Sequence, residues 1–279
     1  MNTSLLLCTD LDRTLIPNGD APESPAARGW FHQLVASPNV ILAYVSGRHR
    51  ALIEAAMIEY ALPQPQYVIA DVGTTLYSVA NDGWQLLSAW TDQLIPNWPE
   101  PALLQQYVQF FPALTLQPTA QQAPYKVSYQ LPAASVNDAV FCQAVQDYLI
   151  AKNSNVRLIW SCDDTTNTGL LDIVPIAASK RTAIEFLQQL PGVNATKTVF
   201  AGDSGNDLDV LVSPIPAVLV ANATAALRTS AQQQAAALHW NAQLYCAQGG
   251  WAGMNGNYSA GIIEGVAHFY PEMTAHLWQ

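Results

Sequence analysis

Four aspartates in two short segments of the sequence are spaced for joint chemistry. Asp10 and Asp12 follow the apolar run of residues 5–9, whereas Asp203 and Asp207 follow the apolar run TVFAG. Each run has the length and composition of a buried strand, and the carboxyl ends of parallel strands meet at one edge of a sheet. Carboxylates gathered there would repel one another unless a hard, oxygen-seeking cation balanced them. We therefore predict a magnesium site formed by these four residues.

The spacing of Asp10 and Asp12 suits phosphoryl transfer. At a strand end, Asp10 can attack phosphorus as a nucleophile and form an aspartyl-phosphate. Asp12, two residues later, can protonate the leaving alcohol and afterwards activate water. Thr14 can fix the turn that holds the pair and is also a candidate phosphate-binding residue. Taken alone, the segment DLDRT leaves open the alternative of an Asp-rich turn that closes a strand.

Residues at three further segment ends are candidates for holding a phosphate group. Ser46 and Gly47 precede a helical segment whose free amides suit a phosphate oxygen, although a simple helix N-cap is the alternative. Lys180 begins another helical segment and can neutralise both nucleophile and phosphate, or it can be solvated. Asn206 in AGDSGND can donate to phosphate, and the alternative there is a calcium-type loop. The occurrence of all these segments in this order favours a phosphatase.

Composition limits the classes of partner. The chain has 279 residues, 50% of them hydrophobic, which suits two modest domains or one domain with a large insertion. Its formal charge of −10, without a basic block, argues against nucleic acid and an anionic membrane surface as partners. The 4 cysteines lack the spacing of a zinc site, and no stretch resembles a signal peptide or a membrane span. We expect a cytoplasmic protein, and the sequence does not predict its oligomeric state.

The order of strand-like and helix-like segments predicts an α/β fold. The first 80 residues alternate between the two, which is typical of a parallel sheet covered by helices. A Pro-rich stretch and antiparallel-looking strands then interrupt the alternation, which resumes at residue 171. We predict a Rossmann-like parallel-sheet core formed by residues 1–80 and 171–279, with an inserted α+β cap domain formed by residues 81–170. Strands are expected at 4–9, 40–45, 67–73, 125–131, 156–160, 198–202 and 217–221, and helices at 25–36, 48–60, 101–110, 136–151, 180–190 and 261–270.

The inserted domain is predicted to move as a lid. Its connections to the core, near residues 79–83 and 168–175, contain Gly83 and Gly169, which could absorb a backbone rotation. Closure of this lid would exclude bulk water while the substrate remained in contact with the cap. We therefore expect the two glycines to act as hinges.

These segments resemble the motifs of the haloacid dehalogenase superfamily of phosphatases. DLDRT is similar to the first motif, VSGR to the second, Lys180 to the third and GDSGND to the fourth. The insertion is similar to the cap of the Cof-type branch. Within that branch the chain resembles the sucrose-6-phosphate phosphatase family over nearly its whole length, in PYKVSYQL, LLDIVPIAASKR, LVANATAALR and SAGIIEGVAHF.

The resemblance implies a role for each motif residue. Asp10 would be the nucleophile and Asp12 the acid and base. Both acidic segments would supply the ligands of Mg²⁺: Asp10, the backbone carbonyl of Asp12, and Asp203, supported by Asp207. Polar residues of three motifs would bind the phosphate: Ser46, Lys180 and Asn206. In the cap, Lys126 and Ser128 would select the sugar.

The resemblance also implies hydrolysis of a sugar phosphate, with sucrose 6-phosphate as the first expectation. The alternatives are a mannosylfructose, glucosylglycerol or glycosylglycerate phosphate, and, from a different class, a non-catalytic sugar-phosphate-binding module. A phosphomutase would need a second phosphate site, and 11 Lys and Arg residues leave little to build one. The loops 161–169 and 247–261 look longer than the family pattern, and we expect both to line the sugar pocket.

Overall fold

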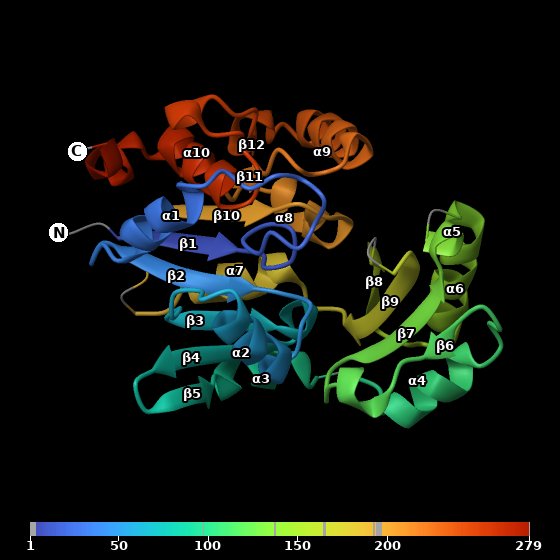
Figure 1. Ribbon diagram of the computed structural model, residues 1–279. Helices are drawn as coiled ribbons and strands as arrows, with labels where there is room; N and C mark the ends of the chain where they lie inside the picture. Colours follow the sequence, from blue (N-terminus) through green and yellow to red (C-terminus); the bar gives the residue numbers. More distant parts are fainter. Residues whose placement is uncertain are drawn as a thin grey trace.

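The computed structural model describes residues 4–96, 98–136, 138–163, 166–191, 193 and 197–278. These residues form two units that lie side by side, a larger one built on an eight-stranded sheet and a smaller one built on a four-stranded sheet (Figure 1). The prediction of an α/β fold with a Rossmann-like core and an inserted α+β cap is confirmed. Among the described residues, no helix combines the length and the apolar character needed to cross a membrane.

The larger sheet has the strand order β12-β11-β10-β1-β2-β3-β4-β5. Its strands are β1 (Leu5–Thr9), β2 (Val40–Val45), β3 (Tyr67–Ala70), β4 (Thr75–Ala80), β5 (Gly83–Leu86), β10 (Thr198–Gly202), β11 (Ala217–Leu219) and β12 (Leu244–Cys246). The strands from β12 to β3 run parallel, and β4 and β5 complete the edge in antiparallel pairing. The parallel strands therefore bring their carboxyl ends to the same edge.

Both faces of this sheet are covered by helices. One face packs against α1 (Ala27–Val35), α2 (Arg50–Glu59) and α10 (Ser259–Phe269), and the other against α3 (Ser88–Leu94), α7 (Lys180–Leu187), α8 (Leu208–Leu211) and α9 (Ala225–Ala237). Along β1, Leu5 and Leu7 point to the first face, whereas Leu6 and Cys8 point to the second. A strand buried on both faces must be apolar at nearly every position, which explains the apolar run of residues 5–8.

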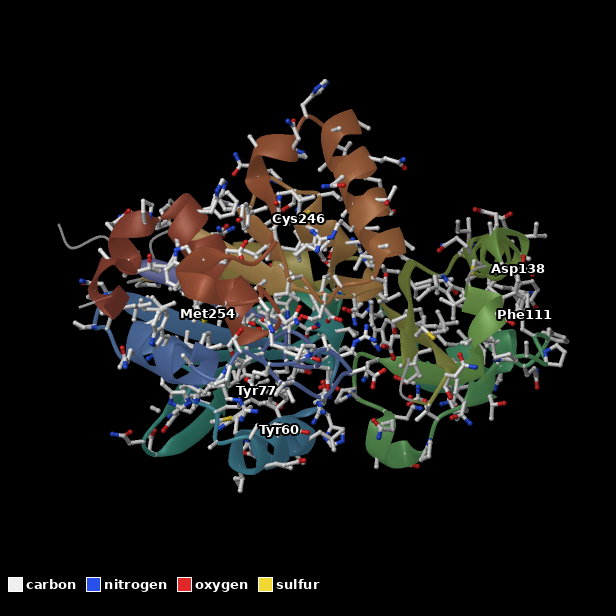
Figure 2. All side chains as sticks on the ribbon, turned by 45° about the horizontal axis from the view of Figure 1, so that its top comes forward. Tyr60, Tyr77, Phe111, Asp138, Cys246 and Met254 are labelled. Atoms are coloured by element: carbon white, nitrogen blue, oxygen red, sulfur yellow. The ribbon has the colours of Figure 1, made fainter. Side chains whose placement is uncertain are left out.

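The smaller sheet is the cap. Its strands are β6 (Thr115–Leu116), β7 (Val127–Pro132), β8 (Val156–Asp163) and β9 (Thr168–Pro175), in the antiparallel order β6-β7-β9-β8. Helices α4 (Pro101–Val108) and α6 (Ala139–Ala151) cover one face, and α5 (Ala133–Val136) follows β7. Phe111, labelled in Figure 2, belongs to this covered face. Along β7, Val127 and Tyr129 point into the cap core, so that Ser128 points to the opposite face.

Single turns of 3₁₀-helix join several of these elements. They are η1 (Asp71–Gly73), η2 (Thr119–Gln121), η3 (Gly205–Asp207), η4 (Asn241–Gln243), η5 (Trp251–Gly253), η6 (Pro271–Met273) and η7 (Ala275–Trp278). The predicted strand 67–73 therefore ends at Ala70, where η1 begins. Two of these turns, η1 and η3, carry residues of the site described below.

The structure corrects the boundaries of the cap, which were predicted as 81 and 170. β5 pairs with β4 and extends the larger sheet, and the Trp90 indole of α3 donates to the Gly73 carbonyl at 3.0 Å. At the other end, β9 remains in the cap sheet as far as Pro175. The cap elements therefore run from α4 to β9, about 101–175.

The predicted hinges are also wrong. Gly83 lies in the hairpin between β4 and β5, and Gly169 pairs with Leu131 and Cys162 inside the cap sheet. Sheet pairing holds both glycines, because each belongs to a strand of a single unit. The connections that link the two units are the segments between α3 and α4 and between β9 and α7.

Candidate active site

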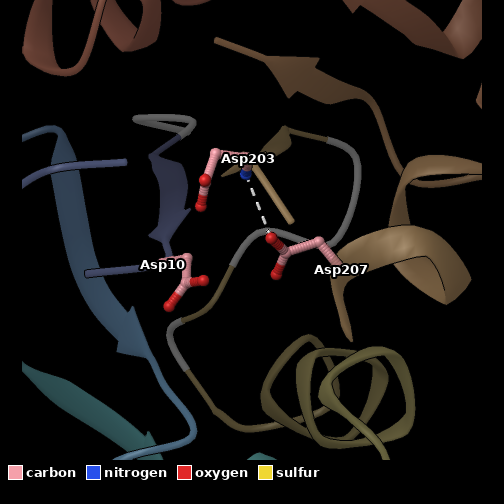
Figure 3. Close-up of side chains that lie close together, drawn as sticks. All are labelled: Asp10, Asp203 and Asp207. Carbon is pink, nitrogen blue, oxygen red and sulfur yellow. Dashed lines mark hydrogen bonds between the residues drawn. The ribbon is translucent and has the colours of Figure 1, made fainter. Parts of the chain in front are cut away.

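Three of the four predicted aspartates meet at the carboxyl ends of β1 and β10. Asp10 directly follows β1, Asp203 directly follows β10, and Asp207 ends the turn η3. The three side chains lie close together (Figure 3). All three are buried, and one carboxylate oxygen of each lies within 4.8 Å of one oxygen of the other two. The neighbouring parallel strands β1 and β10 are what place Asp10 next to Asp203.

The loop GDSGND is wrapped around the carboxylate of Asp207. Its Oδ2 accepts the backbone N–H groups of Asp203 and Ser204, each at 3.0 Å. A Cβ atom at Gly202 would lie 2.6 Å from the Asp207 carboxyl carbon, so only glycine allows this approach. The local sequence thus fixes Asp207 as the support of the loop that presents Asp203 and Asn206.

Lys180 is the cation at the centre of the acidic cluster. It is the first residue of α7, behind the N-cap Ser179, and only 2% of it is exposed. Its Nζ donates to Asp207 Oδ1 at 2.7 Å and to Asn206 Oδ1 at 2.9 Å, and lies 3.0 Å from Asp10 Oδ2. The sequence prediction that Lys180 faces the nucleophile therefore agrees with the geometry, and the solvated alternative does not.

The carboxylates of the cluster carry more negative charge than the site balances. Burial raises the pKa of Asp10 well above its ordinary value, Lys180 opposes this effect, and the neighbouring aspartates add to it. Burial and the charge of Asp207 raise the pKa of Asp203 to about 7. Burial lowers the pKa of Lys180, but the charges of Asp10 and Asp207 raise it overall. A site of this kind favours an additional cation.

The carboxylate of Asp12 does not join the cluster, which corrects the prediction that four carboxylates gather. Arg48 donates from Nε to Oδ2 at 2.8 Å and from Nη2 to Oδ1 at 2.6 Å, and Asn18 Nδ2 donates to Oδ1 at 2.7 Å. Burial raises the pKa of Asp12, but the hydrogen bonds from Arg48 lower it overall. A bidentate guanidinium contact of this kind holds the carboxylate in one orientation at the cleft wall.

Residues of the first motif support Asp203. Thr14 Oγ1 donates to Asp203 Oδ1 at 3.1 Å, and Arg13 Nε donates to Asp203 Oδ2 at 3.0 Å. Thr14 is fully buried, so its hydroxyl serves the aspartate in this structure, whereas the sequence analysis counted it among the phosphate-binding candidates. Asn222 Nδ2 donates to the Arg13 carbonyl at 2.6 Å and thereby fixes the motif loop from behind.

The second motif places one of its two candidate residues on the cleft. Gly47 lines the cleft, whereas Ser46 is buried at the end of β2. Ser46 Oγ accepts the backbone N–H of Arg48 at 3.1 Å and so fixes the loop before α2. The N-cap position of α2 is His49, so the alternative that Ser46 caps this helix does not hold. Sequence reasoning missed Arg13 and Arg48, although their signal was present: each is a basic residue inside a motif that also carries polar site residues.

A cleft of about 550 Å³ separates the acidic cluster from the cap. The core contributes charged and small residues to it: Asp10, Asp12, Arg13, Gly47, Arg48, Asp203 and Asn206. The cap contributes mainly hydrogen-bonding side chains: Gln117, Gln121, Lys126, Ser128, Ser161 and Asp172. Lys126 and Ser128, the two cap residues predicted from the resemblance, therefore line the same cleft as the cluster.

The two long loops differ in their relation to this cleft. Ser161 and Cys162 line it from β8, and the segment predicted as a loop, 161–169, is mostly strand, because β8 runs to Asp163 and β9 begins at Thr168. Residues 164 and 165 lie outside the described residues. None of the described residues that line the cleft belongs to 247–261, so that expectation was wrong. The segment 247–261 packs on the core instead. The rings of Trp251 and Trp30 meet edge to face with their centroids 5.7 Å apart, and Asn257 Nδ2 donates to the Pro22 carbonyl at 2.9 Å.

Comparison with known proteins places this geometry in a family. The family model described as sucrose-6F-phosphate phosphohydrolase matches residues 3–270. The chain belongs to this family. As a sucrose-6F-phosphate phosphohydrolase family member, it is a phosphoric monoester hydrolase of the haloacid dehalogenase superfamily, which confirms the predicted enzyme class.

Individual relatives agree with the family assignment. A protein of Nitrosococcus oceani named as a HAD-like hydrolase is 44% identical over 278 residues, which are 99% of this chain and 74% of that protein. The mannosylfructose-phosphate phosphatase of Agrobacterium fabrum is 30% identical over 268 residues, 95% of this chain and 96% of that protein. The sucrose-phosphatase of Synechocystis sp. PCC6803, solved in complex with sucrose and phosphate, superimposes with a TM-score of 0.76 at 26% identity, covering 96% of this chain and 98% of that one.

Proposed function

We propose that this sucrose-6F-phosphate phosphohydrolase family member hydrolyses sucrose 6-phosphate to sucrose and phosphate, with Mg²⁺ and through phosphorylation of Asp10. One observation carries the proposal. The Asp10 carboxylate lies 3.0 Å from Lys180, inside the acidic cluster, on the wall of a cleft whose opposite wall bears the polar side chains of the cap. The carboxylate of Asp10, with Lys180 beside it, thus faces the polar side chains of the cap that would bind the sugar.

The donor set of the cluster fits a magnesium ion. It consists of buried carboxylate oxygens, the ligand type that Mg²⁺ prefers. Burial, and after it the charge of Asp207, raises the pKa of Asp203 to about 7, and a bound cation would offset both effects. Asp10 and Asp203 would hold the ion together with the backbone carbonyl of Asp12, and Asp207 would support them. When bound, Mg²⁺ would supply positive charge for the phosphate oxygens during transfer.

Asp10 is held in an orientation suited to nucleophilic attack. Its Oδ1 accepts the backbone N–H of Leu11 at 2.7 Å, while Oδ2 faces Lys180. Asp12 would donate a proton to the leaving sugar oxygen and then take a proton from the water that hydrolyses the phosphorylated Asp10. Because Arg48 keeps Asp12 ionised in the arrangement described, protonation before the first step would require looser Arg48 contacts. Lys180, Asn206 and Gly47 would bind the phosphate.

The cap face suits a disaccharide. Amide, hydroxyl and ammonium groups can pair with sugar hydroxyls, and the cleft volume lies within the range of small-molecule sites. The relative that binds sucrose and phosphate supports sucrose 6-phosphate. A second candidate is mannosylfructose phosphate, which the relative from Agrobacterium fabrum favours because it matches 95% of this chain.

A substrate panel tests the proposal. We expect kcat/KM for sucrose 6-phosphate to exceed that for glucose 6-phosphate by at least about tenfold, or roughly 1.4 kcal/mol of transition-state binding. Removal of Mg²⁺ with a chelator should abolish both activities reversibly. Higher kcat/KM for mannosylfructose phosphate than for sucrose 6-phosphate would favour the second candidate, and equal values for both disaccharide phosphates and glucose 6-phosphate would refute disaccharide selectivity.

A further inference from the structure

A buried ion pair joins the cap to the core at the edge of the cleft. Lys126, just before β7 of the cap, and Asp71, the first residue of η1 in the core, are each only 5% exposed. Lys126 Nζ lies 3.3 Å from Asp71 Oδ1. Because both charges are removed from water, neither is effectively screened by solvent, and each depends on the other.

The backbone of Asp71 is held in an unusual conformation. Asp71, Val72 and Gly73 have consecutive φ values of 52°, 54° and 100°, and a β-branched residue such as Val72 rarely adopts the left-handed region. A strained turn persists only where its surroundings fix it. A Cβ atom at Gly73 would lie 2.4 Å from the backbone of Ser179, so the turn packs tightly against the start of α7.

This turn is bonded to the same loop that carries the second motif. The backbone N–H of Asp71 donates to the Arg48 carbonyl, and that of Val72 donates to the Ser46 carbonyl, both at 3.1 Å. Asp71 is therefore fixed relative to the phosphate end of the cleft. Lys126, in contrast, belongs to the cap and lines the cleft itself.

Burial raises the pKa of Asp71, and the charge of Lys126 opposes this effect. Within the described residues, Oδ1 of Asp71 is shielded from solvent and accepts no hydrogen bond of good geometry. This oxygen forms the ion pair with Lys126, at 3.3 Å. Asp71 therefore holds Lys126 against the core by its charge and not by a well-formed hydrogen bond.

We propose that Asp71 is a positioning residue for sugar selection: its fixed carboxylate holds the ammonium of Lys126 at the cap wall of the cleft, where it can donate to the glycosyl part of the substrate. This inference rests on the proposed function. It extends that function because it locates one determinant of selectivity in the core, outside the cap. The ratio of kcat/KM for a disaccharide phosphate to that for an aryl phosphate therefore depends on Asp71.

The test compares Asp71→Asn with wild type on sucrose 6-phosphate and p-nitrophenyl phosphate. Asparagine tolerates the left-handed region, so the turn is retained while the charge is lost. We expect the ratio of the two kcat/KM values to fall at least about tenfold, mainly through a higher KM for the disaccharide phosphate. Asp147→Asn, an exposed aspartate of α6 bonded to Gln143, is the matched control and should leave the ratio unchanged.

A double variant separates positioning from a general structural role. If Asp71 acts through Lys126, then Asp71→Asn combined with Lys126→Gln should lower the ratio no further than Lys126→Gln alone. Additive losses, or an unchanged ratio in Asp71→Asn, would overturn the proposal. Should wild type prefer another disaccharide phosphate, the proposed substrate fails, and the same ratios measured with the preferred compound decide on Asp71.

A crystal structure of Asp71→Asn gives a readout independent of activity. We expect the Lys126 ammonium to leave its place beside residue 71, because the carboxylate that attracts it is gone. An unmoved Lys126 side chain in this variant would contradict the proposed role, whatever substrate the enzyme prefers.

Discussion

Replacement of Lys180 by methionine should destabilise the metal-free protein strongly. Methionine is a comparably long, unbranched side chain but lacks the charge, so the substitution tests electrostatics with little change in packing. The lost ammonium lies 2.7 Å from Asp207 Oδ1 and 3.0 Å from Asp10 Oδ2, and both carboxylates are buried. Removal of one partner from a buried ionic network costs about 3–5 kcal/mol, since the remaining charges stay in a poorly hydrated site.

Protonation of Asp10 limits this loss. The pKa of Asp10 is already raised by burial, and without Lys180 it would rise further, so the carboxyl would take up a proton more readily. The difference in unfolding free energy between wild type and Lys180→Met should therefore shrink as the pH falls below neutrality.

Thermal unfolding in the presence of a chelator measures the effect. A loss of about 3–5 kcal/mol corresponds to a fall in Tm of roughly 6–20 °C for a unit of this size. Lys197→Met is the control, because Lys197 pairs with the exposed Glu272 at 3.0 Å and such surface pairs contribute about 0–1 kcal/mol. Addition of Mg²⁺ should raise the Tm of Lys180→Met more than that of wild type, because the ion replaces the missing positive charge.

Equal Tm values for Lys180→Met and Lys197→Met in chelator would refute this reasoning. Such a result would mean that Lys180 does not balance the acidic cluster in the metal-free protein.

Three further predictions concern the same site. Asp10→Asn should lower kcat by several orders of magnitude while the circular dichroism spectrum is retained, and substantial turnover by the purified variant would remove the covalent mechanism. Asp203 has a pKa of about 7 in the folded chain, against an ordinary value of 3.8. Between about pH 4 and about pH 7, the folded chain therefore keeps a proton on Asp203 that the unfolded chain has lost. The unfolding free energy of metal-free protein should consequently fall as the pH rises from about 4 to about 7. Mg²⁺ should raise Tm more at about pH 8 than at about pH 5.5, because Asp203 must lose its proton to bind the ion. An equal rise in Tm at both pH values would contradict the proposal that Asp203 binds Mg²⁺. Gly73→Ala should destabilise the protein by more than about 1 kcal/mol, because the added Cβ would meet the Ser179 backbone and the residue has a φ of 100°. Gly29→Ala is the control and should be neutral or stabilising, because Gly29 lies in α1 and its Cβ would have no atom within 4 Å. A lower Tm for Gly29→Ala than for Gly73→Ala would count against the tight turn.

The parts of the site that follow strands could be predicted from the sequence. Asp10 and Asp203 were placed correctly because a run of apolar residues that ends in an acid marks both the strand and its carboxyl end. Lys180 was placed because it begins a helical segment and resembles the third motif, and in the structure it is the first residue of α7. In each case local pattern and global topology agree.

Other features depend on contacts between distant segments. The carboxylate of Asp12 was expected to gather with the other three, but Arg48, 36 positions away, binds it. Asp71 pairs with a cap lysine, which no local pattern indicates. The hairpin of β4 and β5 did have a local signal, Asn-Asp-Gly between two strand-like runs, but the sequence analysis interpreted this change of pattern as the start of the cap.

The central claim is that phosphate passes through Asp10, and trapping of the intermediate tests it most directly. Asp12→Asn protein, which lacks the group proposed to activate water, would be mixed with Mg²⁺ and p-nitrophenyl phosphate, whose leaving group departs without a proton from Asp12. The mixture would be quenched and treated with borohydride, which reduces an aspartyl-phosphate to homoserine. The account predicts homoserine at residue 10 in the mass spectrum, dependent on substrate and absent from Asp10→Asn protein. Release of phosphate in a single turnover of wild type, with residue 10 unmodified in all quenched samples, would contradict it.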